Sequence, residues 1–144
     1  MNLILQEDEK GCGLACVAMI CGHTYQEAKA KVVPHCWGGQ FTHYDAFEYF
    51  NLHGFSYQHW YRHTRFILPE HDSIFPERSP WPIATPFADF HMLLTRGDIG
   101  HWVAMDFTGE IYDPVRGRGK KIEEYEVMQI IGVWAGAKEG KNNG

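Results

Sequence analysis

The chain has 144 residues, 44% of them apolar, and a formal net charge of −5 at pH 7. This length is typical of one domain that removes roughly 70% of its unfolded surface from water, and the composition excludes wholesale disorder. The negative charge argues against broad binding to nucleic-acid phosphates, and no apolar run reaches the ~18 residues of a membrane span.

The start of the chain and its cysteines bear on the cellular compartment, and its last residues bear on the extent of the domain. The start turns acidic after three consecutive apolar residues, which is not the pattern of a secretory signal. Four cysteines without such a signal indicate a reducing compartment, so we expect a cytoplasmic protein. We expect a single domain over residues 1–137 and a polar, glycine-rich tail over 138–144.

Residues 12–21 are uncharged and poor in β-branched side chains, which favours a helix. The segment is apolar on every side, so we expect the helix to be buried. Gly22 follows it, and glycine suits the left-handed position just after a helix.

Two further helices are predicted from their caps. Thr24 and Glu27 form the spacing of a capping box, which predicts a second helix over residues 25–32. Thr42 can cap a third helix, whose aromatic face continues until Gly54 ends it.

The second half of the chain reads as sheet rather than helix. A segment with five prolines in eighteen residues, from 69 to 86, is irregular or lies at a sheet edge. Helices that come first and strands that come later predict an α+β fold rather than alternating βαβ units. The expected strands cover residues 55–61, 81–85, 101–106, 110–115 and 130–135.

Cys12 is the first candidate for chemistry, because it stands where the acidic start of the chain becomes the buried helix. Unpaired N–H groups and the helix dipole at that position favour a thiolate and lower the pKa of the thiol. The same N–H groups could hold a developing oxyanion. Taken alone, Cys12 is more simply interpreted as a small buried residue, as we expect for Cys16 and Cys21.

His101 and Asp113 are the second candidate pair. Residues 106–109, Asp-Phe-Thr-Gly, suit a type I turn followed by a left-handed glycine. Such a turn pairs residue 106 with 110, 103 with 113 and 101 with 115. His101 and Asp113 then share one face, about 7–8 Å apart between Cα atoms, within reach of a bridging hydrogen bond. A two-residue loop would place them on opposite faces.

Nucleophile, base and orienting acid thus occur in the order Cys12, His101, Asp113, an arrangement suited to acyl transfer through a thiol. Gln6 completes the set, because its side-chain amide could donate a hydrogen bond to the oxyanion.

These motifs resemble the bacteriocin-processing cysteine peptidases, which are papain-like domains often fused to peptide-exporting ATP-binding-cassette transporters. Gln6 followed by Cys12-Gly-Leu-Ala-Cys16 is similar to the signature of that family. Gly100-His101-Trp-Val and Tyr112-Asp113-Pro114 are similar to its histidine and Asp-Pro motifs. Weaker similarity covers the segments that begin at Gly22, Gly38, Trp81 and Ile131.

The resemblance implies a papain-like α+β fold and a cysteine peptidase without a cofactor. It assigns Cys12 as nucleophile, His101 as base, Asp113 as orienting acid and Gln6 as oxyanion donor. The implied partner is a peptide or protein, cut after small residues such as Gly-Gly. Two features depart from the family: Gly11 stands where members often have Asp, and the interval from His101 to Asp113 is short, at twelve residues.

Other readings of the same residues stay open. A structural zinc site could use cysteines and histidines near the first helix, although no Cys-x₂-Cys pair exists. The basic run over residues 116–121 could bind nucleic acid or attract an acidic substrate, but a solvated loop is the simpler interpretation. The domain could also be a catalytically silent peptide-docking module, or hydrolyse a different amide or an isopeptide. The zinc candidates are Cys12, Cys16, Cys21, His23, His35 and Cys36.

Overall fold

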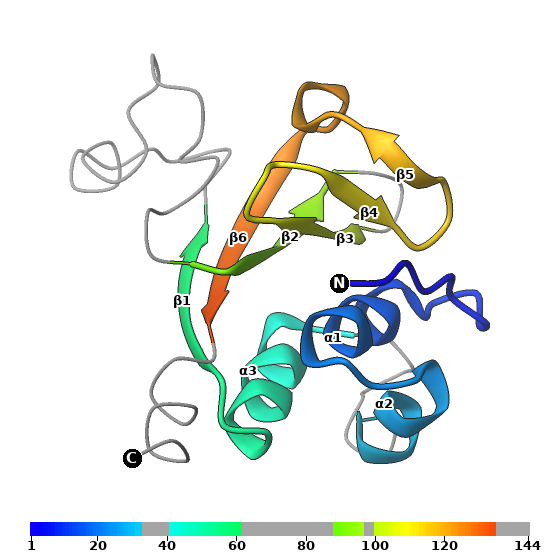
Figure 1. The fold of residues 1–144 in the computed structure, drawn as a ribbon, viewed down its shortest axis with the longest axis vertical. Helices are drawn as coiled ribbons and strands as arrows, with labels where there is room; N and C mark the ends of the chain where they lie inside the picture. Colours follow the sequence, from blue (N-terminus) through cyan, green and yellow to red (C-terminus); the bar gives the residue numbers. More distant parts are fainter. Residues whose placement is uncertain (33–40, 62–87, 97–99, 135–144) are drawn as a thin grey trace.

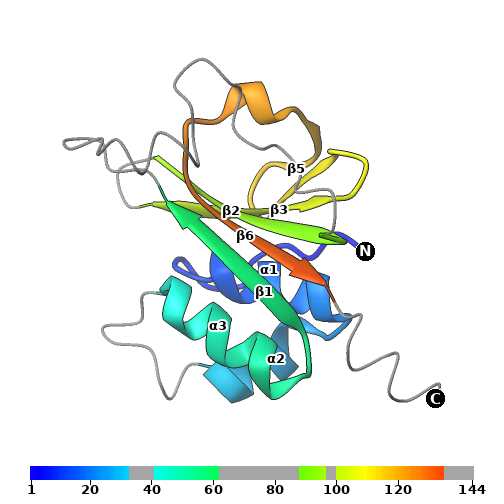
Figure 2. The same ribbon diagram turned by 90° about the vertical axis from the view of Figure 1, so that its left-hand side faces the viewer.

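The computed structural model describes residues 1–32, 41–61, 88–96 and 100–134. Three helices come first, and they lie together against one side of a sheet formed by the later part of the chain (Figures 1 and 2). No helix among these residues is long and apolar enough to cross a membrane. The predicted strand over 81–85 and the predicted tail over 138–144 lie outside the described residues.

The helices begin and end where their caps predict. α1 covers Cys12–Cys21, and Gly22 after it is left-handed, with φ 74°. α2 covers Tyr25–Val32, and Thr24 and Glu27 form the expected reciprocal hydrogen bonds at its start. α3 covers His43–Leu52, capped by the side chain of Thr42. The three predicted helices are thereby confirmed.

Within the described residues, six strands form one antiparallel sheet in the order β1-β6-β2-β3-β4-β5. One turn of 3₁₀ helix, Ile122–Glu124, precedes the last of these strands. The strands are β1 (Ser56–Tyr61), β2 (Phe90–Thr95), β3 (His101–Asp106), β4 (Ile111–Asp113), β5 (Gly117–Lys120) and β6 (Val127–Trp134).

Two of these strands have no counterpart in the sequence prediction. β2 is a central strand between β6 and β3, and most of its residues are buried, so it lacks the alternation that signals a half-buried strand. β5 is an edge strand made of Gly and basic residues, which have low strand propensity. β6 also begins three residues earlier than predicted, at Val127.

The helix layer explains why α1 is apolar all round. α1 packs on β3 and on both other helices, so the sheet covers one side of it and the helices cover the other, while α3 also contacts β1 directly (Figure 2). Every residue from Gly13 to Ile20 is buried. The first residue of α1, Cys12, is left at the margin of this core and only half-buried.

Alternate residues of β3 serve two separate cores. Trp102 and Ala104 belong to the large core shared with the helices. Val103 and Met105 belong to a smaller core that includes residues of β6 and the 3₁₀ turn. Both faces of the central sheet are thus covered, which holds the start of β3 firmly in place.

The α+β fold with helices packed on an antiparallel sheet is therefore confirmed. Its consequence for function is geometric. The N-terminus of α1 and the first residue of β3 are far apart in the sequence, and the packing of α1 on β3 brings them together.

Candidate active site

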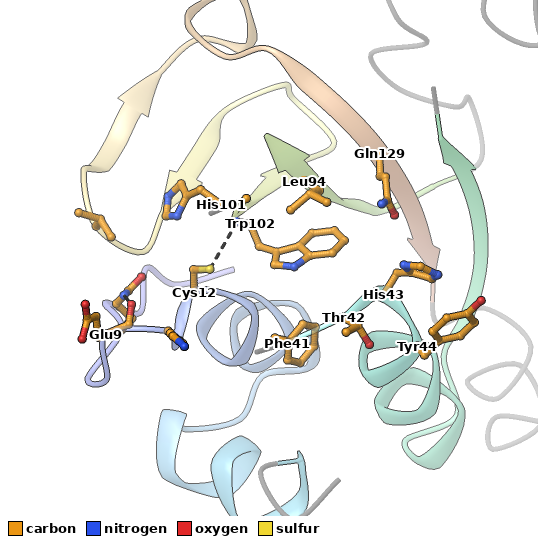
Figure 3. Close-up of a pocket in the computed structure, with 14 residues that line it drawn as sticks. Glu9, Cys12, Phe41, Thr42, His43, Tyr44, Leu94, His101, Trp102 and Gln129 are labelled. Carbon is orange, nitrogen blue, oxygen red and sulfur yellow. Dashed lines mark hydrogen bonds between the residues drawn. The ribbon is translucent and has the colours of Figure 1, made fainter. Parts of the chain in front are cut away.

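Cys12 lies at the N-terminal end of α1, directly after the N-cap residue Gly11. Its Sγ accepts a hydrogen bond from the backbone N–H of Trp102 at 3.5 Å, which links the helix to β3 (Figure 3). His101, the neighbour of Trp102, also lies beside the thiol in this view. The structure thus brings together two side chains that are far apart in the sequence.

His101 and Asp113 form a direct hydrogen bond, with Nε2 of the imidazole 2.8 Å from Oδ1 of the carboxylate. β3 and β4 pair Ala104 with Tyr112 and Met105 with Ile111, which is the predicted register. The turn between the strands is also as predicted, since the N–H of Gly109 donates to the carbonyl of Asp106 and Gly109 has φ 90°. The predicted placement of the pair on one face is confirmed.

Asp113 is fully buried, and four hydrogen bonds compensate for its burial. Oδ1 accepts from His101 and from the backbone N–H groups of Val115 and Arg116, at 2.8 and 3.1 Å. Oδ2 accepts from the hydroxyl of Tyr125 at 2.7 Å. Burial raises the pKa of this carboxyl, but the hydrogen bonds from His101, Tyr125 and the backbone outweigh it and hold the pKa below its usual range.

The imidazole and the thiol shift each other's protonation in opposite directions. The hydrogen bond to Asp113 and then the one to Cys12 raise the pKa of His101 to about 9, although burial opposes this. Burial raises the pKa of Cys12, but hydrogen bonds from His101 and from the backbone of Trp102 bring it below its usual value. The imidazole is therefore cationic at neutral pH, and its charge increases the share of Cys12 that is ionised there.

The other described cysteines lack this character. Burial raises the pKa of Cys16 well above its ordinary value, and the negative charges of Cys12 and Asp113 add to the effect. Burial raises the pKa of Cys21 to about 12. Among the described cysteines, only Cys12 is poised to react as a thiolate.

Gln6 lines the cleft beside Cys12, but its amide is already engaged. Its Nε2 donates to the backbone carbonyls of Asp8 and Glu9, both at 2.9 Å, so neither amide hydrogen is free. Its Oε1 is buried without a hydrogen-bond partner among the described residues. The structure brings Gln6 to the site, yet donation to an oxyanion requires the side chain to release a carbonyl.

A cleft of about 610 Å³ runs past the thiol and the imidazole. Glu9 lies on one side of Cys12, whereas Phe41, His43 and Tyr44 lie on the other (Figure 3).

Two features of the site have no clear signal in the sequence. Tyr125 follows the 3₁₀ turn and belongs to no recognisable motif, so only the packing of that turn shows that its hydroxyl reaches Asp113. The glycine at position 11 is explained by Tyr25, because a Cβ on Gly11 would lie 1.9 Å from the Tyr25 hydroxyl oxygen.

The structure also bears on the two other interpretations, a structural zinc site and a role for the basic run over residues 116–121. No three His, Cys, Asp or Glu side chains converge as metal ligands within the described part of the chain, which leaves out His35 and Cys36. In the basic segment, Arg118 makes a two-pronged ion pair with Glu110. Arg116 stacks on Tyr125 and lies 3.8 Å from Glu124. Much of the positive charge of this segment is therefore offset locally.

Comparison with solved structures identifies the fold. The chain is similar to a double-glycine-motif protease from an AMS/PCAT transporter in complex with the leader peptide, with a TM-score of 0.62 and 14% identity over 92% of this chain and 89% of the other. It is also similar to the peptidase domain of Streptococcus ComA, a bifunctional ABC transporter involved in quorum sensing, with a TM-score of 0.57 and 16% identity over 91% and 96%. No protein-family model and no curated protein sequence matches the chain. The shared architecture confirms the predicted papain-like fold and its structural resemblance to double-glycine peptidase domains.

Proposed function

We propose that this protein is a cysteine peptidase that cleaves a peptide after small residues such as Gly-Gly. The observation that carries the proposal is the thiol of Cys12 at a helix N-terminus, beside an imidazole that a buried carboxylate orients. The nearly full-length structural likeness to double-glycine peptidase domains supports it. One of those domains was solved with a leader peptide, which supports a peptide as the substrate.

In the proposed reaction, the thiolate of Cys12 attacks the carbonyl carbon of the scissile bond. The charge that develops on oxygen is held by the N–H of Cys12 and by the amide of Gln6, once that amide releases a backbone carbonyl. His101 gives its proton to the leaving nitrogen as the C–N bond breaks, which yields a thioester. Asp113 keeps Nε2 of the ring occupied, so the other ring nitrogen faces the thiol.

Hydrolysis of the thioester completes the cycle. His101, now neutral, takes a proton from water as the water oxygen attacks the acyl carbon. The C–S bond then breaks, the acyl group leaves as a carboxylic acid, and the thiolate and imidazolium form again. No step needs a metal or an organic cofactor.

The proposal is tested by labelling and by cleavage. Iodoacetamide at neutral pH, with the modified residue located by mass spectrometry, is expected to label Cys12 and to spare Cys16 and Cys21. A peptide with Gly-Gly before the scissile bond is expected to be cut, and one with two leucines there to survive. Cys12→Ala is expected to abolish cleavage, whereas Cys16→Ser retains it.

Two results would contradict the proposal. Equal damage from the changes at Cys12 and Cys16 would indicate a structural pair of thiols. Selective labelling of Cys12 without cleavage of any peptide in a library would instead favour a domain that docks peptides or hydrolyses another class of amide.

A further inference from the structure

The loop that precedes α1 is fastened to α2 through Asp8. The hydroxyl of Tyr25 donates to Oδ2 of Asp8 at 2.8 Å, and the ammonium of Lys29 lies 3.0 and 2.9 Å from the two carboxylate oxygens. Tyr25 is 3% exposed and its hydroxyl fills the space beside Gly11. The position of the hydroxyl is thus set by packing, and it anchors Asp8 in turn.

The backbone carbonyl of Asp8 contacts two residues next to the proposed active site. The carbonyl of Asp8 accepts from Nε2 of Gln6 at 2.9 Å and from the N–H of Gly11 at 3.0 Å. Gly11 is the N-cap of the helix that carries Cys12. A chain of contacts therefore leads from Tyr25 and Lys29, through Asp8, to the amide of Gln6.

We propose that Asp8 is a positioning residue for the oxyanion donor Gln6. This inference rests on the proposed peptidase function and assigns Asp8 a task within it. The ion pair with Lys29 is exposed, so it adds little to folding stability. Its effect is geometric instead. The carboxylate fixes the position of the backbone carbonyl of Asp8, which holds the Gln6 amide before that amide turns to the oxyanion. A displacement of about 1 Å at a catalytic group can cost ~10²-fold in rate.

The proposed role of Asp8 affects hydrolysis of a peptide but not the reactivity of the Cys12 thiol. Cleavage of an amide passes through an oxyanion, whereas alkylation by iodoacetamide does not. Asp8→Ala is therefore expected to lower kcat/KM for the Gly-Gly peptide about tenfold and to leave the rate of Cys12 alkylation within about twofold. This lies below the ~10²–10³-fold loss typical when an oxyanion donor is removed outright.

A double-mutant cycle tests the coupling. In a Gln6→Ala background, Asp8→Ala is expected to cause no further loss of kcat/KM, because the group that it positions is gone. Glu7→Gln is the matched control, since Glu7 lies in the same loop and contacts α2 through Gln26 at 2.6 Å, without holding Gln6. This control is expected to hydrolyse the peptide at the rate of the unmodified protein.

The side-chain amide of Gln6 gives a readout that does not need turnover. In ¹⁵N NMR spectra of the full chain, Asp8→Ala is expected to move the Gln6 Nε2 resonances toward those of an exposed amide, and Glu7→Gln is not. If no peptide is cleaved, the peptidase proposal fails, while these spectra still decide whether Asp8 holds the amide of Gln6 in place.

Three outcomes would overturn the role of Asp8: unchanged Gln6 resonances, equal losses of hydrolysis and alkylation, or additive effects in the cycle. Should Asp8→Ala fold poorly, Tyr25→Phe removes one donor to the carboxylate and is expected to give a smaller effect of the same kind.

Discussion

Replacing Asp113 by Asn tests whether the buried carboxylate generates the reactive thiol. The pKa of His101 is about 9 against an ordinary value of 6.5, which is a proton affinity roughly 300-fold higher. The hydrogen bond to Asp113 is the largest cause and the one to Cys12 is the second, while burial opposes both. An amide in place of the carboxylate removes the negative charge, so the imidazole is expected to be neutral at pH 7.

Without the imidazolium, the thiolate of Cys12 loses its main source of stabilisation. Burial is the largest influence on the pKa of Cys12 and raises it, so Asp113→Asn is expected to bring that pKa above its ordinary value. The rate of Cys12 alkylation at pH 7 is expected to fall by at least tenfold, with roughly 300-fold as the upper limit. The deficit is expected to shrink as the pH rises toward 10, because a growing share of Cys12 in the variant is then ionised.

The assay is the rate of iodoacetamide labelling of Cys12 from pH 5 to pH 10. Asp106→Asn is the control, because Asp106 belongs to the same hairpin but bonds Thr108 and Glu110 rather than His101. An unchanged rate at pH 7 would refute the reasoning. A deficit of the same size at every pH from 7 to 10 would show that the substitution disturbs access to the thiol rather than its ionisation.

Three further predictions follow from the geometry around the site. Tyr125→Phe is expected to lower the free energy of unfolding by about 1.5–3 kcal/mol at pH 7, measured in urea, because a buried carboxylate oxygen of Asp113 loses its donor. In a Cys12→Ala background, stability is expected to fall as pH rises above 6.5, because Asp113 still raises the pKa of His101 in the folded protein; the loss is expected to be smaller than about 3 kcal/mol and to end below pH 9, because the contribution of Cys12 is gone. Gly11→Ala is expected to destabilise the protein by about 1–3 kcal/mol in thermal unfolding, since its methyl group would displace the buried hydroxyl of Tyr25.

Each of these has its own control. Tyr112→Phe removes a hydroxyl whose bond to Asp106 is longer, at 3.3 Å, so a loss as large as that of Tyr125→Phe would argue against a special role for Tyr125. A pH slope that survives Asp113→Asn in the Cys12→Ala background would assign the titration to another group. In the third case, Gly11→Ala combined with Tyr25→Phe is expected to recover part of the lost stability, because the clashing oxygen is gone; no recovery would locate the strain elsewhere.

The local sequence determined the helices and the turn, because these depend on interactions between residues that are close together in the chain. Charge-free residues between Gly11 and Gly22 form the buried helix, and Thr24 and Thr42 begin the next two helices. The turn at residues 106–109 set the register that joins His101 to Asp113, because turn chemistry and a two-residue side-chain period together fix which face a residue takes. The motifs around Cys12, His101 and Asp113 resemble those of the bacteriocin-processing cysteine peptidases, and this resemblance indicated the papain-like architecture.

Tertiary structure alone decided the contacts between distant segments. β2 escaped prediction because a strand buried on both faces shows no alternation, yet it forms the middle of the sheet. Three contacts depend on where loops lie after the core has packed. They are the hydrogen bond of Tyr125 to Asp113, that of Tyr25 to Asp8, and that of the Gln6 amide to the Asp8 carbonyl. No periodicity encodes such contacts, because side chains that meet through packing need share no spacing along the chain.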